Sequence, residues 1–191
     1  PGRAQLQCSF FAGATPAVQT LCAPSIATYD ISVSENFVGP VDLTLVNLPM
    51  GPTAVFDQTT VNPGEGTQMT ITGTENLTEG VYSFLLNGTD GTNESNQSLT
   101  LTILVGAPAA TTLLSPVDLA TDQFTGLLLT WAQQPLSENY NVEIATDPGF
   151  TNIIGMGMNL TATSFQTPNL EVLTTYYWRV RSVNLCGEGE W

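Results

Sequence analysis

The sequence predicts an all-β protein built from two tandem β-sandwiches, and three observations lead to this prediction. The 191 residues include 28 Thr and 13 Asn, whereas only 10% are charged, and such a composition favours pleated, half-buried strands over helices. Several short segments alternate strictly between apolar and polar residues, which is the period of a strand with one buried face. Clusters of Gly, Pro, Asn and Asp separate these segments at the spacing typical of sandwiches and barrels.

The clearest strand of the first half lies at residues 27–33. Here Ala27, Tyr29, Ile31 and Val33 alternate with polar residues, so one side of the strand is expected to face a core. The same alternation predicts further strands at residues 41–45, 69–71, 82–86 and 99–105, with turns at 38–40, 48–52, 62–64 and 90–91.

The strand pattern is interrupted at residues 106–112, which are small residues with one proline, Pro108. Because proline cannot donate a ladder hydrogen bond inside a sheet, we place the domain boundary there. The predicted organisation is a first sandwich at residues 1–105, a linker at 106–112 and a second sandwich at 113–191. Alternating residues predict strands of the second sandwich at 127–131, 140–144 and 176–180.

The charged residues exclude several classes of function. With 17 acidic and 3 basic side chains the formal net charge is −14, which repels a phosphate backbone, so nucleic acid is not expected as a partner. The chain has no His and no Lys, and therefore lacks the commonest general base, the commonest zinc ligand and the amine of Schiff-base chemistry. We expect no catalytic residues and no enzymatic activity in this chain.

The ends and the apolar runs bear on the cellular context. No apolar run reaches the roughly 18 residues that cross a bilayer, so no membrane span is expected in this segment. The chain begins Pro1-Gly2-Arg3, which is neither an initiator methionine nor a signal peptide. We expect an internal part of a longer protein.

Three cysteines leave two interpretations open. A bridge between Cys8 and Cys22 would close a loop of about 15 residues and stabilise the first domain by about 3 kcal/mol in the chain-entropy model. The alternative is that both are buried thiols, since free cysteine is among the most buried residue types. Cys186 has no evident partner in either interpretation.

The loop at residues 87–96 contains the candidate metal ligands. Asp90, Asn93 and Glu94 supply the oxygen donors that calcium prefers. The alternative is a hairpin turn, because Gly, Asn and Asp are also the residues that a tight connection between two strands requires. Calcium is the only cofactor for which the sequence offers candidates.

In the second half, residues 129–135 and 140–144, then Leu170 followed by residues 174–184, cover nearly all of the second domain. Together these stretches resemble a fibronectin type III module. The resemblance implies that Trp131 fills the core and that Tyr176, six positions after Leu170, forms the tyrosine corner of the family, although Val172 stands where the family usually has Pro. It also implies that most of the last strand is missing, because Trp191 follows soon after the preceding strand.

The same resemblance bears on Arg179 and Arg181, which lie on the outward face of the predicted strand at 176–184. In a type III module that strand lies beside the one at 140–144, which implies a cross-strand ion pair with Glu143. The alternative is a guanidinium patch for an anionic ligand, with Trp191 stacked on one arginine. Exposed aromatic residues at Phe37, Phe150 or Tyr177 are further candidates, for stacking on carbohydrate.

The first half has its own set of matching segments, at residues 22–24, 41–45, 48–51, 61–64 and 78–82. These segments are similar to the immunoglobulin-like repeats that accompany such modules in large secreted bacterial proteins. Tandem pairs of this kind often follow the catalytic domain of reprolysin-like zinc metallopeptidases in Bacteroidetes and related bacteria. The resemblance implies a bacterial, secreted or cell-surface parent protein.

Two functions follow as expectations. The first is a non-catalytic extracellular spacer and interaction module whose partners are the other domains of the parent chain. The alternative is an adhesion module that binds glycan or extracellular protein with the assistance of calcium. A glycan array and a test for calcium-dependent heat stability would separate the two.

Overall fold

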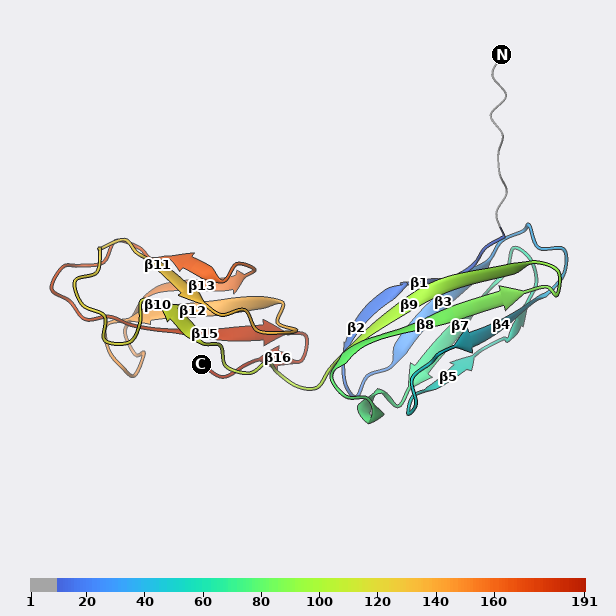
Figure 1. Cartoon of the computed structure of the whole chain (residues 1–191), viewed down its shortest axis with the longest axis horizontal. Helices are drawn as coiled ribbons and strands as arrows, with labels where there is room; N and C mark the ends of the chain where they lie inside the picture. The colour runs from blue at the N-terminus through green and yellow to red at the C-terminus, as the bar shows by residue number, and fades with distance from the viewer. Residues whose placement is uncertain (1–9) are drawn as a thin grey trace, which may run out of the picture. The chain divides into compact units, whose positions relative to one another are not determined.

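The computed structural model describes residues 10–191, and the chain divides into two compact units, Pro1–Val105 and Gly106–Trp191. Within the described residues, the elements are β-strands and one three-residue 3-10 helix, η1 (Thr74–Asn76) (Figure 1). The predicted all-β fold class is therefore confirmed. No helix in residues 10–191 is both long and apolar enough to cross a membrane.

The first unit is a sandwich of two sheets. One sheet has the order β1-β3-β7-β5 and the other has the order β2-β9-β8-β4-β6. The strands are β1 (Ala12–Thr15), β2 (Val18–Cys22), β3 (Ala27–Val33), β4 (Val41–Val46), β5 (Thr53–Phe56), β6 (Thr60–Val61), β7 (Gly66–Thr72), β8 (Gly80–Thr89) and β9 (Glu94–Leu104). Because β1 pairs with β3 and β2 pairs in parallel with β9, the first stretch of the described chain contributes to both sheets.

The core of the first unit lies between the two sheets. The apolar residues predicted to face inward on β3 are all buried, and the intervening polar residues are exposed. The ring of Tyr29 meets that of Phe84 edge to face, with centroids 6.3 Å apart. Such pairs add about 0.5–1.5 kcal/mol to the gain from burial alone.

Tyr29 has an unusual position for a tyrosine, because its side chain is fully buried and its hydroxyl has no hydrogen-bond partner. Burial raises the pKa of Tyr29 to about 12, from an ordinary value of about 10. The unfolded chain therefore releases this proton first, and the folded state loses stability as the pH rises from about 10 to about 12.

We expect Tyr29→Phe to leave the free energy of unfolding at neutral pH unchanged or slightly higher, because it removes a desolvated polar group that has no partner. The variant should also lose stability less steeply than the parent above pH 10. Urea unfolding at neutral and alkaline pH measures both effects. Tyr140→Phe is the control, because the Tyr140 hydroxyl accepts hydrogen bonds from the Gln134 amide and from Ser137; its loss should cost about 1 kcal/mol.

The second unit is a smaller sandwich. Its sheets have the orders β10-β11-β14 and β13-β12-β15-β16. The strands are β10 (Leu113–Ser115), β11 (Leu128–Trp131), β12 (Asn139–Ala145), β13 (Ile153–Leu160), β14 (Ser164–Gln166), β15 (Tyr177–Asn184) and β16 (Gly187–Glu188). Trp131 lies at the centre of the core and meets the Tyr140 ring at a centroid distance of 5.6 Å.

The segment predicted as a linker, residues 106–112, is hydrogen-bonded to the second unit. Asn184 donates to the Gly106 carbonyl at 3.1 Å, and Ser182 donates to the Ala109 carbonyl at 2.8 Å. On the side of β15 away from β12, β16 supplies a short strand of two residues. The edge of β15 is therefore partly covered.

Two tyrosines fix the corners at which strands enter the sheets. The Tyr176 hydroxyl accepts a hydrogen bond from the Glu171 amide at 2.9 Å, so this residue forms the corner that the resemblance implies. In the first unit, the Tyr82 hydroxyl donates to the Thr78 carbonyl at 2.9 Å. Each unit therefore has a tyrosine whose hydroxyl is hydrogen-bonded to the backbone a few residues earlier in the chain.

Candidate functional site

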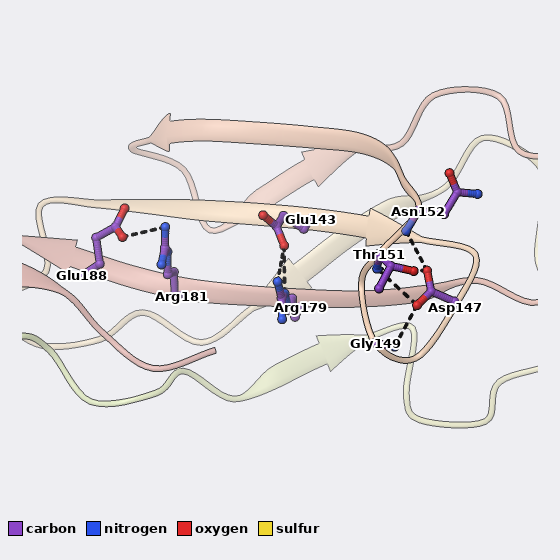
Figure 2. Close-up of polar contacts among 8 residues, drawn as sticks. All are labelled: Glu143, Asp147, Gly149, Thr151, Asn152, Arg179, Arg181 and Glu188. Atoms are coloured by element: carbon purple, nitrogen blue, oxygen red, sulfur yellow. Dashed lines mark hydrogen bonds and ion pairs between the residues drawn. The ribbon is translucent and has the colours of Figure 1, made fainter.

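The candidate site is the outer face of β12 and β15, where Arg179 and Arg181 are the basic side chains. The register of the two strands places Arg179 opposite Glu143. The guanidinium donates from Nε at 2.8 Å and from a terminal nitrogen at 2.6 Å to one oxygen of the Glu143 carboxylate (Figure 2). The predicted cross-strand ion pair is confirmed.

Arg181 has a partner that the sequence did not indicate. Its guanidinium lies 2.6 Å from a carboxylate oxygen of Glu188 on β16 (Figure 2). The other oxygen of Glu188 accepts a hydrogen bond from the Asn141 side chain at 3.1 Å. Glu188 thus joins β12, β15 and β16, and each arginine has its own carboxylate.

Aromatic rings complete this arrangement, which we call the Arg–aromatic stack and define as Phe150, Arg179, Arg181 and Trp191. The Arg179 guanidinium lies 4.0 Å from the centroid of Phe150 and 4.3 Å from that of Trp191. Arg181 lies 4.4 Å from the Trp191 centroid. Trp191 therefore contacts both arginines, whereas the sequence suggested contact with one.

A turn at residues 147–152, which we call the Asp147 turn, positions Phe150. The Asp147 carboxylate accepts hydrogen bonds from the amides of Gly149 at 3.0 Å, Thr151 at 3.1 Å and Asn152 at 2.7 Å (Figure 2). These donors, the Asn152 amide first, lower the pKa of Asp147. Phe150 lies in the middle of this turn with a positive φ of 53°, so the turn determines where its ring points.

The three aromatic residues named as candidates for carbohydrate stacking differ in the structure. Phe37 is 4% exposed, belongs to the core of the first unit and contacts the Phe10 ring at 5.4 Å, so the expectation that it is exposed is wrong. Phe150 is half-buried against Arg179. Tyr177 keeps an exposed side chain.

We expect Arg179→Lys to lower the free energy of unfolding by about 1 kcal/mol, because lysine keeps the charge but loses the planar group that contacts two rings and bonds Glu143. Urea denaturation measures the change. A double-mutant cycle with Glu143→Gln separates the ion pair from the ring contacts, because only the ion pair is shared. Equal midpoints for Arg179→Lys and the parent would show that the Arg–aromatic stack contributes no stability.

The candidate calcium ligands lie at the turn between β8 and β9, and Asp90 organises that turn. The Asp90 carboxylate accepts hydrogen bonds from the amides of Asn93 at 2.7 Å, Thr92 at 2.9 Å and Val38 at 3.0 Å. These bonds, that of Asn93 first, hold the pKa of Asp90 well below its ordinary range. A carboxylate surrounded by N–H donors is the arrangement of a structural turn.

Glu94 belongs to a different set of contacts. It accepts hydrogen bonds from the side chains of Asn87 at 2.6 Å and Asn96 at 3.0 Å. The structure therefore brings Asp90 and Asn93 together, and it ties Glu94 to the two asparagines. Across residues 10–191, no three His, Cys, Asp or Glu side chains gather closely enough to hold a metal ion.

We expect added calcium to leave the melting temperature unchanged, and Asp90→Ala to lower it with or without calcium. At pH values above its ordinary pKa, the ionised Asp90 carboxylate contributes its full stabilisation to the folded state. This contribution is lost as the pH falls through the lowered pKa of the folded state. Thermal melts at neutral and acidic pH, with calcium and with a chelator, measure both effects. A calcium-dependent rise in the melting temperature that Asp90→Ala abolishes would contradict the structural interpretation.

The structure describes two cysteines, Cys22 and Cys186. Cys22 and Cys186 are both disulfide-bonded, so the interpretation of Cys22 as a free thiol is wrong, whereas Cys8 lies outside the described residues. A bridge between Cys8 and Cys22 within the chain would account for the oxidised state of Cys22 but not for that of Cys186. The Cys8–Cys22 pairing stays a prediction, and a peptide map under non-reducing conditions tests it.

Comparisons with known proteins bear on the fold. No protein-family model matches the chain, and no curated protein matches it. Among solved structures, an I-band fragment from titin aligns with 96% of this chain and 63% of its own length, at 12% identity and a TM-score of 0.51. The FN1-FN3 domains of chicken CNTN1 align with 91% of this chain and 60% of their own length, at 12% identity and a TM-score of 0.41.

A two-domain fibronectin type III segment from chicken tenascin aligns with 95% of this chain and 93% of its own length, at 14% identity and a TM-score of 0.34. The chain spans less than two thirds of the titin and CNTN1 fragments. At such identities a likeness shows the fold alone. The chain has the β-sandwich architecture of immunoglobulin-like and fibronectin type III-like domains.

Proposed function

We propose that this chain is a non-catalytic spacer and interaction segment of a larger extracellular protein. The observation that carries the proposal is that the conspicuous polar side chains make contacts within the fold. Arg179 and Arg181 bond carboxylates and aromatic rings, and Asp90 and Asp147 accept amide hydrogen bonds at their own turns. The lack of His and Lys in the sequence also supports it.

Two properties support the extracellular part of the proposal. Cys22 and Cys186 are disulfide-bonded, and disulfides persist in oxidising compartments. The net charge of −14 without a single lysine favours solubility through like-charge repulsion. The resemblance of the first half to bacterial immunoglobulin-like repeats extends the proposal to a secreted bacterial zinc metallopeptidase as the parent, with its active site outside this chain.

A second candidate function is an adhesion module that binds glycan or extracellular protein. The observation that favours it is the position of Trp191 and Tyr177, each 37% exposed, on or near the strand that carries the arginines. Arginine and aromatic residues are enriched where proteins bind partners.

A binding screen separates the two functions. The purified chain is applied to a glycan array and to immobilised extracellular matrix proteins, with calcium and with a chelator. The spacer function predicts no signal. A signal that Tyr177→Ala or Trp191→Ala abolishes would establish the adhesion function, provided that Phe124→Ala, a change at an exposed phenylalanine in a loop of the same unit, leaves the signal intact.

A further inference from the structure

One edge strand of the four sheets in residues 10–191 is longer than the other edge strands. Among residues 10–191 the sheets have eight edge strands, and seven of these are between two and five residues long. The exception is β13 (Ile153–Leu160), which has eight residues. An edge strand exposes unpaired backbone N–H and C=O groups, and proteins commonly keep such edges short to prevent pairing with another chain.

The sequence of β13 contains none of the residues that usually block an edge. Residues 153–160 read IIGMGMNL, with no proline and no charged side chain, although the chain has 17 acidic residues. Lysine, proline, inward-pointing charges and β-bulges are the common protections; of these, β13 has only irregularities in its pairing with β12, at residues 153–155 and 157–160. Two acidic copies of this chain could therefore approach one another along β13 without bringing like charges together there.

The outward face of β13 is apolar. Ile154, Met156 and Met158 alternate along the strand and are 39%, 57% and 49% exposed. On the opposite face Gly157 is buried, and a Cβ there would lie 2.7 Å from the Phe165 ring. Gly157 lets the strand lie close to the core, and Leu160 packs against that core, whereas Ile154, Met156 and Met158 are the side chains of β13 that point to the outside.

Across the sheet from Met156, the facing side chains on β12 and β15 together carry no net charge. Met156 lies opposite Glu143, which lies opposite Arg179 on the next strand, and these two charges are paired at 2.6 Å. The sheet thus presents an apolar stripe, defined as Ile154, Met156 and Met158, beside a compensated ion pair. Methionine, arginine and aromatic side chains are enriched at protein interfaces.

The apolar stripe is also complementary to itself. If two β13 strands pair antiparallel about a two-fold axis at Met156, then Met156 lies opposite Met156 and Ile154 lies opposite Met158 of the other copy. Each side of such an interface presents the same patch, as an isologous dimer requires. The self-complementary order and the lack of charge both favour a second copy of this chain as the occupant.

We propose that two copies of this chain associate through their β13 strands and join their four-stranded sheets into one continuous sheet of eight strands. Backbone hydrogen bonds along β13 supply affinity, and the apolar stripe sets the register. Because each copy has a net charge of −14, added salt screens their repulsion and strengthens the dimer. This inference does not depend on the proposed function, since a spacer and an adhesion module can both dimerise.

The test is the molar mass of the purified chain in solution, measured by sedimentation equilibrium from micromolar to near-millimolar concentration at low and high sodium chloride. We expect a monomer–dimer equilibrium that shifts toward dimer at high salt. Met156→Lys should weaken it by about tenfold or more, because it sets like charges opposite each other at the two-fold axis. Met50→Lys is the matched control, because Met50 is exposed in a turn of the first unit, and it should dimerise like the parent.

Two measurements keep the result interpretable. Non-reducing electrophoresis separates this association from a covalent dimer, which an odd number of cysteines can form. Hydrogen exchange of the β13 amides should slow as the concentration rises. A monomer at every concentration and salt, an unchanged dimer in Met156→Lys, or unprotected β13 amides in the dimer would each overturn the proposal. If the melting temperature of Met156→Lys is lower than that of Met50→Lys, the dimerisation test is repeated with Met158→Lys.

Discussion

Trp131→Ala should unfold the second unit or bring it close to unfolding. The Trp131 side chain is 1% exposed and lies at the centre of the core beside Tyr140. Truncating a buried aromatic side chain to alanine costs about 3–5 kcal/mol, and a domain of this size is stable by only about 5–15 kcal/mol. The loss is therefore a large fraction of the stability available.

Urea unfolding followed by circular dichroism measures this effect. Trp191→Ala is the matched control, because it removes the same side chain from the surface of the same unit, where it is 37% exposed. We expect the control to cost about 1 kcal/mol through its contacts with Arg179 and Arg181. If Trp131→Ala and Trp191→Ala lose similar amounts, the packing of this core is not as the structure shows.

Gly88→Ala should destabilise the first unit by about 1–3 kcal/mol, the usual range for an overpacked core. Gly88 lies on β8, and a Cβ there would lie 2.6 Å from the Cβ of Ala12 and 3.1 Å from a methyl group of Val41. Both neighbours belong to strands whose backbone positions are fixed by pairing, so neither can move away easily.

Thermal melts of Gly88→Ala and of the control Gly39→Ala test this prediction. A Cβ at Gly39 would meet no atom within 4 Å. The control should therefore be neutral or gain about 0.4–1 kcal/mol, because alanine reduces the conformational entropy of the unfolded chain. A melting temperature of Gly88→Ala equal to that of the parent would contradict the packing between β1 and β8.

The strands with regular alternation could be predicted from the sequence because one face of each contacts the core. β3 is the clearest example, since its predicted inward residues are those that are buried. β13 was not predicted, because its sequence IIGMGMNL places two isoleucines side by side and glycines where apolar side chains would mark the buried face. Pairing with β12 makes this segment a strand.

The candidate site was predicted in part for a similar reason. The Glu143–Arg179 pair follows from the adjacency of two strands, which the fibronectin type III resemblance implied. The contact of Phe150 with Arg179 was missed, because it depends on how the Asp147 turn directs one ring. A signal for that turn exists in the sequence, since Asp147-Pro148-Gly149 is a typical turn tripeptide.

For Phe37 the prediction of surface exposure was wrong. This residue was expected at the surface, in a segment that contains Val38 and otherwise polar residues, Gly and Pro. It is buried because the fold brings it against the core of the first unit. Burial of an isolated aromatic residue in a loop depends on residues distant in the sequence, and a local pattern does not contain that information.

By itself the sequence determined the class of fold, the alternating strands, the turns and the acidic, lysine-free character, because each depends on the residues of one short segment and on their intrinsic preferences. The tertiary structure decided which side chains meet: the partner of each arginine, the donors around Asp90, the position of Phe37 and the place of β13 at a sheet edge. These features require segments that are distant in the chain to lie side by side, and the packing of the whole sandwich selects that arrangement.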